Sequence, residues 1–322
     1  MPSCCLEDII GDTMHHPVEI VEVAPRDGFQ SIAAPIPTKA KIEIIEGLID
    51  AGLRRLEIGS FVSPRAVPQM ADMPDIARHF RSDSRARLSV LVPNAKGAEM
   101  AMTHGLREIV YVFSVSEAHN QNNVRQSVQQ SIDGLANVVS AISNEPDFRL
   151  RVDLATAFDC PFDGAVPFDA VRAAIERVTD LAPACEIALC DTTGRATPFA
   201  VQERMRAVQR LAVPPSCTWA FHGHDTYGMG VANAFAAYQA GIGVLDVAAA
   251  GLGGCPFAPG ATGNTATEDL VYAFLNSGIS TGIDLVSLLL VADRIAAIPD
   301  AKVASHLRNV PRAAMQERMR QP

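Results

Sequence analysis

The 322-residue chain lacks long apolar runs: although 48% of its residues are hydrophobic, no apolar stretch approaches the roughly 20 residues that a membrane-spanning helix requires. This excludes a membrane-spanning protein. Residues 1–16 are acidic and contain histidine, whereas a secretory leader is basic and then apolar, so we expect no leader. A soluble, cytoplasmic protein is therefore expected.

An excess of positive charge is also missing. The chain has 27 Lys and Arg residues against 36 Asp and Glu residues, a net charge of −9. Such a chain has no general attraction for nucleic acid or anionic membranes. An anionic substrate must instead be held by local arginines, a metal ion or helix N-termini.

Clustered cysteines are absent as well. The seven cysteines are odd in number and widely scattered: Cys4, Cys5, Cys160, Cys185, Cys190, Cys217 and Cys255. This pattern is typical of a reduced compartment and offers no thiolate cluster for a metal.

What the sequence does contain is a repeated alternation of short apolar runs and helical periodicity. Strands are predicted at Val18–Val23, Leu53–Ile58, Arg87–Val92, Glu108–Phe113, Arg149–Ala155, Glu186–Cys190, Thr218–His222 and Leu245–Ala248. Helices are predicted from Thr38 to the stop at Gly52, and near 68–80, 94–104, 121–143, 167–181, 198–210 and 229–241. Eight such units predict an α/β fold, a closed (β/α)₈ TIM barrel.

An open nucleotide-binding sheet is the alternative, but its glycine fingerprint is missing, because Pro256 follows Gly251, Gly253 and Gly254 where a further glycine is needed. We expect residues 1–16 to be an irregular lead-in, residues 17–300 to form the barrel with an extra C-terminal helix at Ile283–Ile298, and residues 301–322 to be a loose tail. No second globular domain is indicated.

Polar residues follow several predicted strands, where a TIM barrel carries its active site. These are Arg26 and Asp27, Glu57, Asp191, His222 and His224, and Cys255 and Asn264. Each residue also has a purely structural explanation. Asp27 and Asp191 can accept hydrogen bonds from turn amides, and Glu57 can form an ion pair with Arg26. Asn264 can cap the following helix. Together they favour a metal site.

Asp27, His222, His224 and Asn264 combine carboxylate, imidazole and amide ligands, which suits Mg²⁺ or Mn²⁺, with zinc as the alternative. Arg26 is placed to neutralise charge developing on a carbonyl oxygen. Cys255 lies in a glycine-rich loop that resembles a mobile lid, where a thiol can exchange a proton. Cys190 directly precedes Asp191 and is a further cysteine of interest.

Four stretches together resemble the 3-hydroxy-3-methylglutaryl-coenzyme A (HMG-CoA) lyase family, metallolyase barrels related to isopropylmalate synthase. They are VAPRDGFQ at 23–30, IGSFVSPRAVPQM at 58–70, HGHDTYG at 222–228 and the Cys255 loop at 251–264. The resemblance spans roughly residues 18–280 and implies that Asp27, His222, His224 and Asn264 bind the metal. It also implies that Arg26 stabilises an enolate, with Glu57, Asp191 and Cys255 supporting catalysis. The implied reaction is retro-Claisen cleavage of HMG-CoA to acetyl-CoA and acetoacetate.

Ser31, Ile32, Ala66 and Gly223 depart from the family pattern, which leaves the acyl group open. A lyase for a related 3-hydroxyacyl-CoA or citramalyl-type CoA ester is the first alternative. A condensing synthase is disfavoured by Cys255 and by the lack of a regulatory domain, and a non-catalytic CoA-ester-binding protein has no need of the full residue set. The expected partner is a CoA thioester, and a homodimer is one possible assembly that the sequence leaves open.

Overall fold

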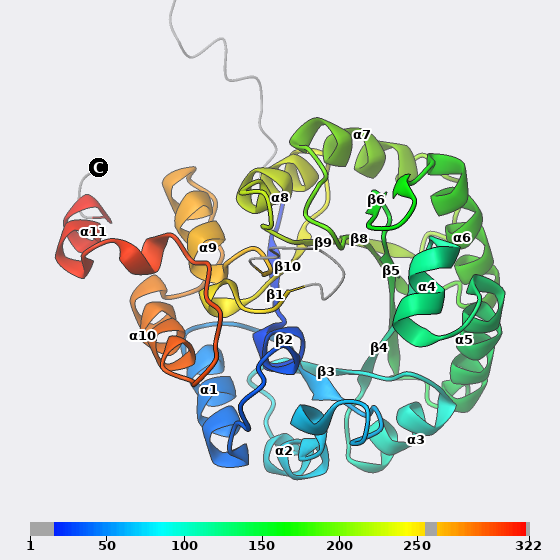
Figure 1. Ribbon diagram of the computed structural model, residues 1–322, viewed down its shortest axis with the longest axis horizontal. Coiled ribbons are helices and arrows are strands. Elements are labelled where there is room, and N and C mark those ends of the chain that lie inside the picture. Colours follow the sequence, from blue (N-terminus) through cyan, green and yellow to red (C-terminus); the bar gives the residue numbers. More distant parts are fainter. Residues whose placement is uncertain (1–15, 255–262, 320–322) are drawn as a thin grey trace, which may run out of the picture.

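Eight parallel strands close into a barrel in the computed structural model, which describes residues 16–254 and 263–319 (Figure 1). The order around the barrel is β1-β10-β9-β8-β5-β4-β3-β2. The barrel strands are β1 (Glu19–Glu22), β2 (Arg55–Ser60), β3 (Arg87–Leu91), β4 (Glu108–Ser114), β5 (Arg149–Ala155), β8 (Glu186–Asp191), β9 (Thr218–Gly223) and β10 (Val244–Val247). The predicted (β/α)₈ barrel is confirmed.

Helices surround the strands, and the chain passes through one or more of these helices between one barrel strand and the next (Figure 1). They are α1 (Thr38–Asp50), α2 (Met73–Phe80), α3 (Ala95–Thr103), α4 (Glu117–Val124), α5 (Val128–Ile142), α6 (Phe168–Leu181), α7 (Pro198–Val208), α8 (Gly230–Gln239), α9 (Thr267–Asn276), α10 (Leu285–Ala296) and α11 (Arg312–Met319). The extra C-terminal helix that the sequence predicts at 283–298 is α10.

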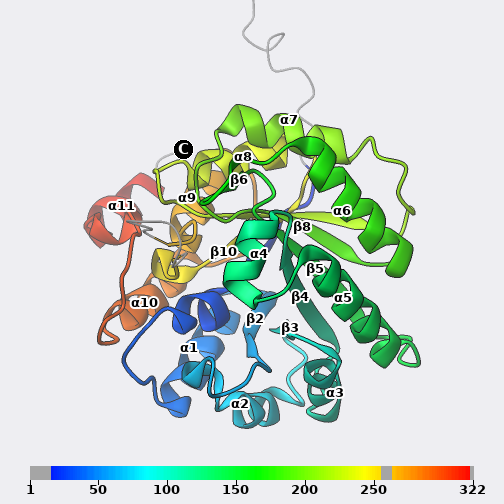
Figure 2. The same cartoon turned by 45° about the vertical axis from the view of Figure 1, so that its right-hand side comes forward.

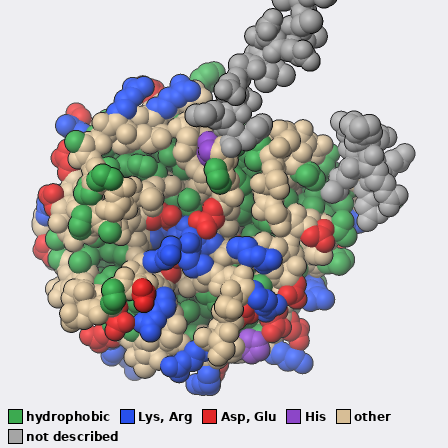
Figure 3. Space-filling model, turned by 180° about the vertical axis from the view of Figure 1, so that it is seen from behind, with side chains coloured by type: hydrophobic (Ala, Val, Ile, Leu, Met, Phe, Trp, Pro, Cys, Tyr) green, Lys and Arg blue, Asp and Glu red, His purple; other side chains and the backbone are tan. Residues whose placement is uncertain are grey.

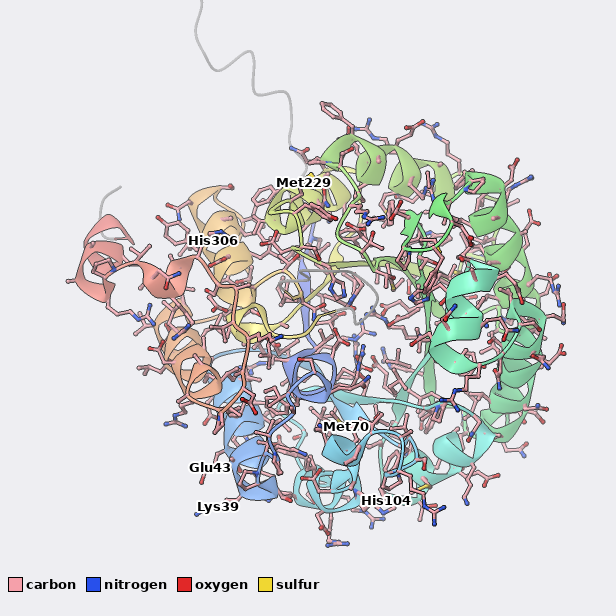
Figure 4. All side chains as sticks on the ribbon, in the orientation of Figure 1. Lys39, Glu43, Met70, His104, Met229 and His306 are labelled. Atoms are coloured by element: carbon pink, nitrogen blue, oxygen red, sulfur yellow. The ribbon has the colours of Figure 1, made fainter. Side chains whose placement is uncertain are left out.

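The main core lies between the barrel and its helices. On α1, Ile45, Leu48 and Ile49 recur at helical spacing and are buried, as are the outward-facing Leu56 and Ile58 of β2. The opposite face of α1 carries charge: Lys39 and Glu43, 3.7 Å apart, lie at the periphery of the ring (Figure 4). The apolar stripe of each helix thus determines which side faces the strands.

The interior of the barrel is charged at its N-terminal end. Arg55 bonds to Glu108 at 2.8 Å and to Glu186 at 2.7 Å, while Arg87 bonds to Glu19 at 2.8 Å. Seen from behind, Arg, Lys, Asp and Glu side chains gather at the middle of this face (Figure 3). Because buried charges are tolerated only when paired, these ion pairs fix the strands that carry them relative to one another.

Two predicted helices differ in the structure. The single helix expected at 121–143 is divided into α4 and α5, because Arg125 adopts a left-handed conformation (φ 59°) and Ser127 with Gln130 forms a capping box that starts α5. The predicted helix near 68–80 is likewise a 3₁₀ turn, Pro68–Met70, followed by α2. The turned view of Figure 2 shows α4 at the front of the molecule, and this helix contacts β4.

Two further features were not predicted. Residues 159–165 form a small antiparallel hairpin of β6 (Asp159–Cys160) and β7 (Gly164–Ala165). Within the tail that the sequence predicts at 301–322, residues Arg312–Met319 form α11, in which Met315 is buried. Residues 1–15 of the predicted lead-in lie outside the described residues, and the division into lead-in, barrel and tail stays a prediction.

Within the described part of the chain, no helix has the length and apolar character needed to cross a membrane. Cys160, Cys185, Cys190 and Cys217 are free and buried.

Candidate metal centre and active-site cavity

Three predicted ligands meet at the C-terminal end of the barrel. His222 is near the end of β9, His224 lies just beyond it, and Asp27 is in a π-helical turn, Ala24–Gly28, after β1. Their potential ligand atoms all lie within 4.8 Å of one another, and the two imidazole centroids are 5.2 Å apart. Residues two apart in a strand face the same side, which is why the His-x-His spacing brings both rings together.

Asn264 joins this cluster through an isolated β-bridge with His224. Its amide nitrogen donates to Asp27 Oδ2 at 2.7 Å and to the Leu252 carbonyl at 2.9 Å. Its Oδ1 atom, like Nδ1 of His224, is buried without a hydrogen-bond partner among the described residues. Because unpartnered buried polar atoms are costly, these atoms fit a centre that a cation completes.

Arg26 lies between Asp27 and Glu57. One guanidinium nitrogen is 2.7 Å from Asp27 Oδ1 and another is 2.9 Å from Glu57 Oε2. Burial alone would raise the pKa of Asp27, but the charge of Arg26 and the two imidazoles lower it to about 2, so this carboxylate is ionised. Burial raises the pKa of Glu57 to about 7 against the opposing effect of Arg26. The predicted Arg26–Glu57 ion pair is present, with Glu57 in the middle of β2 rather than at its end.

A buried carboxylate tethers the turn that carries Arg26 and Asp27. Glu22, at the end of β1, accepts hydrogen bonds from the backbone nitrogens of Ala24 at 2.8 Å and Ala249 at 2.9 Å. It also accepts one from the hydroxyl of Thr267 at 2.6 Å. Burial raises the pKa of Glu22 to about 7. One side chain therefore connects the Arg26–Asp27 turn to the end of β10 and to the start of α9.

Sequence reasoning missed the residues that hold His222. Its Nδ1 atom is 3.0 Å from Asp246 Oδ2 on β10, and Asp246 Oδ1 accepts from Arg151 Nη1 at 2.9 Å. Arg151 Nε also donates to Asp153 at 2.6 Å. A signal existed: Arg151, Asp153 and Asp246 interrupt otherwise apolar strands at positions that face the barrel interior.

Asp191 and Cys255 are the two remaining predicted catalytic residues. Asp191 is fully buried, accepts a hydrogen bond from the Ala196 backbone nitrogen at 3.2 Å, and is not among the described residues that line the cavity. Burial raises its pKa to about 7. Cys255 lies outside the described residues, so its catalytic role stays a prediction.

A cavity of about 970 Å³ opens at this end of the barrel. Arg26, Asp27, His222 and His224 line it, together with residues that the sequence did not single out for the site, among them Gln30, Asn94, Asp153, Thr192 and Lys302. Its size is typical of a small-molecule site.

Of the four residues that depart from the family pattern, only Ser31 is among the described cavity-lining residues. Ala66 is exposed and Ile32 is buried elsewhere. At Gly223, an added Cβ would lie 2.8 Å from a ring carbon of Phe221, so this chain has little room there for a larger side chain. Among the described cavity-lining residues, the departures from the family pattern therefore change the wall of the cavity at Ser31 alone.

Comparison with known proteins agrees with this architecture. The HMGL-like family model matches residues 17–295. The chain is 41% identical over 290 residues to an (R)-citramalyl-CoA lyase of Chloroflexus aurantiacus, covering 87% of this chain and 90% of that protein. It is 40% identical over 280 residues to a hydroxymethylglutaryl-CoA lyase of Pseudomonas mevalonii, covering 87% of this chain and 92% of that protein.

A solved HMG-CoA lyase of Acinetobacter baumannii, in complex with coenzyme A and 3-methylmalate, superposes with a TM-score of 0.84 at 36% identity. That match covers 90% of this chain and 94% of the other. The predicted resemblance is thus confirmed over most of the sequence, and the chain belongs to the HMGL-like family.

Proposed function

We propose that this protein is a divalent-metal-dependent acyl-CoA lyase that cleaves a carbon–carbon bond of HMG-CoA to give acetyl-CoA and acetoacetate. The observation that carries the proposal is the cluster of Asp27, His222 and His224 in one cavity with Arg26. Relatives named hydroxymethylglutaryl-CoA lyase at about 40% identity support the same reaction.

Asp27, His222, His224 and the Oδ1 atom of Asn264 would hold the cation. Two imidazoles, a carboxylate and an amide oxygen suit Mg²⁺ or Mn²⁺ better than tetrahedral zinc. When bound, the cation would polarise the hydroxyl and carboxylate oxygens of the substrate.

In the reaction, the tertiary hydroxyl loses its proton to a base and becomes a carbonyl as the adjacent carbon–carbon bond breaks. The electron pair passes to the thioester as an enolate, which then takes up a proton to give acetyl-CoA. Arg26, in the cavity and always charged, is suited to stabilise the enolate oxygen. Glu57 orients Arg26 through their ion pair, and Asp191 would act as a positioning residue for the chain at 192–196.

The test is a turnover assay with HMG-CoA after chelation and after addition of Mg²⁺ or Mn²⁺, with acetoacetate as the measured product. We expect activity to disappear with the metal and to return with either ion. His224→Ala should abolish metal-dependent turnover, whereas His306→Ala, a change at an exposed histidine beside α9, should not (Figure 4). Metal-independent turnover, or none with any CoA ester, would contradict the proposal.

Cleavage of (R)-citramalyl-CoA to acetyl-CoA and pyruvate is the second candidate. The specific observation in its favour is the 41% identity to the Chloroflexus enzyme of that name. The same assay with both esters separates the two.

A further inference from the structure

Cys190 is a cavity-lining side chain that the proposed reaction does not use. It lies on β8, is 4% exposed, and lines the cavity together with Asp27 and His222. In the barrel it is paired with His222 of the next strand. On the β5 side of Cys190, Leu154 is paired with Leu189, so the next residue of β5, Ala155, lies beside Cys190. Ala155 also lines the cavity.

Cys190 belongs to a small apolar patch in a wall that also carries Asp153 of β5. Cys190 is a free, buried cysteine, and a thiol of ordinary pKa is neutral at pH 7. The Cys190 thiol makes a weak contact of 3.8 Å with the Ala188 carbonyl of its own strand. Ala188 and Ala220 pack with Cys190 in a small apolar cluster. A buried thiol behaves as a small hydrophobic group, so the Cys190 side chain offers a hydrocarbon-like contact beside His222.

The two candidate substrates differ by one methylene in the acyl group. In HMG-CoA a methylene separates the tertiary carbon from the free carboxylate, and in citramalyl-CoA the two are directly bonded. If the hydroxyl and the free carboxylate of both esters bind at the metal-ligand cluster, the extra methylene of HMG-CoA must fit against the neighbouring Cys190 side chain. One methylene in a hydrophobic pocket changes kcat/KM by about 10- to 200-fold.

We propose that Cys190 is the residue that selects the length of the acyl group, by limiting the space between the metal-ligand cluster and the β5–β8 wall. The inference rests on the proposed lyase function and names the side chain that decides between its two substrates. Cys190 is thus a specificity-determining residue and takes no part in the bond-breaking steps.

The test measures kcat/KM for HMG-CoA and (R)-citramalyl-CoA in the wild type, Cys190→Ala and Cys190→Val. The alanine variant enlarges the space, so the ratio of HMG-CoA to citramalyl-CoA cleavage should rise about tenfold or more. The valine variant fills the space and should lower that ratio. Cys185→Ala is the matched control, because Cys185 is also buried and directly precedes β8 but belongs to the core between barrel and helices. It should leave the ratio unchanged.

Opposite shifts in the two variants cannot arise from a general loss of activity, and melting temperatures report whether each variant is folded. If Cys190→Val does not fold, the alanine variant alone decides. A ratio within twofold of wild type in Cys190→Ala, with both esters still cleaved, overturns this inference and leaves the proposed function intact. Failure of the wild type to cleave either ester overturns the proposed function and this inference with it.

Discussion

Asp246→Asn should weaken metal binding although Asp246 lies outside the proposed ligand set. The carboxylate accepts from Nδ1 of His222 at 3.0 Å and from Arg151 at 2.9 Å. Burial alone would raise the pKa of Asp246, but Arg151 and His222 hold it below its usual range, so the group is ionised. It therefore fixes both the orientation and the tautomer of His222, leaving Nε2 free to bind a cation.

The expected loss in metal affinity is about 10- to 100-fold, the usual effect of removing the carboxylate behind a metal-binding histidine. This corresponds to roughly 1.4–2.7 kcal/mol of binding free energy. Stability should fall by less than the 3–5 kcal/mol that is typical when a buried ion pair loses one partner. The reason is that Arg151 keeps Asp153 at 2.6 Å and Glu186 at 3.4 Å.

The assay is a calorimetric titration of the metal-free protein with Mn²⁺, together with urea unfolding. Glu186→Gln is the matched control, because Glu186 is another partner of Arg151 but does not contact His222 in the described structure. We expect the control to lose stability and to keep its Mn²⁺ affinity. An Asp246→Asn protein that binds Mn²⁺ within twofold of wild type would refute the argument that Asp246 prepares His222.

Three further outcomes are expected. Arg26→Gln should leave Mn²⁺ affinity nearly intact while kcat falls at least 10²-fold, about 2.7 kcal/mol of transition-state stabilisation; a kcat within a few-fold of wild type would show that Arg26 has another role. Cys255→Ala should keep the melting temperature and the metal and lose most turnover, whereas a lowered melting temperature with normal kcat would make Cys255 structural. For Glu22, burial raises the pKa from 4.5 to about 7, so its contribution to stability is complete below pH 4.5 and is lost as the pH rises to about 7. Glu22→Gln should therefore reduce the fall in unfolding free energy over this pH range by up to about 3 kcal/mol, as measured by urea unfolding at pH 5–8. If the variant loses unfolding free energy with pH as steeply as the wild type, the raised pKa of Glu22 is contradicted.

The strand–helix alternation and the polar residues after the strands could be predicted from the sequence because both depend on local pattern. Side chains two residues apart point to the same side of an extended strand, so His222 and His224 were expected to emerge together at the end of β9. Barrel closure then brings the end of β1 to the same mouth, which is why Asp27 could be expected near them although nearly 200 residues separate it from His222. The break between α4 and α5 was missed because helical periodicity continues across it, and only the left-handed Arg125 and the Ser127 cap divide the helix.

Only the tertiary structure decided which polar residues reach the cavity. The sequence predicts Glu57 and Asp191 at strand ends, as it does Asp27. In the structure, however, Glu57 lies in the middle of β2 and pairs with Arg26, and Asp191 accepts a hydrogen bond from the backbone of Ala196. Conversely, the sequence alone gives no partner for the charges of Asp246 and Arg151 in their buried strands. Barrel closure brings Asp246 into contact with His222 and Arg151 into contact with Asp246. Sequence determines which side of a strand a residue faces, whereas its distance from the metal-ligand cluster depends on strand stagger and on the packing of neighbouring side chains, which act between residues far apart in the chain.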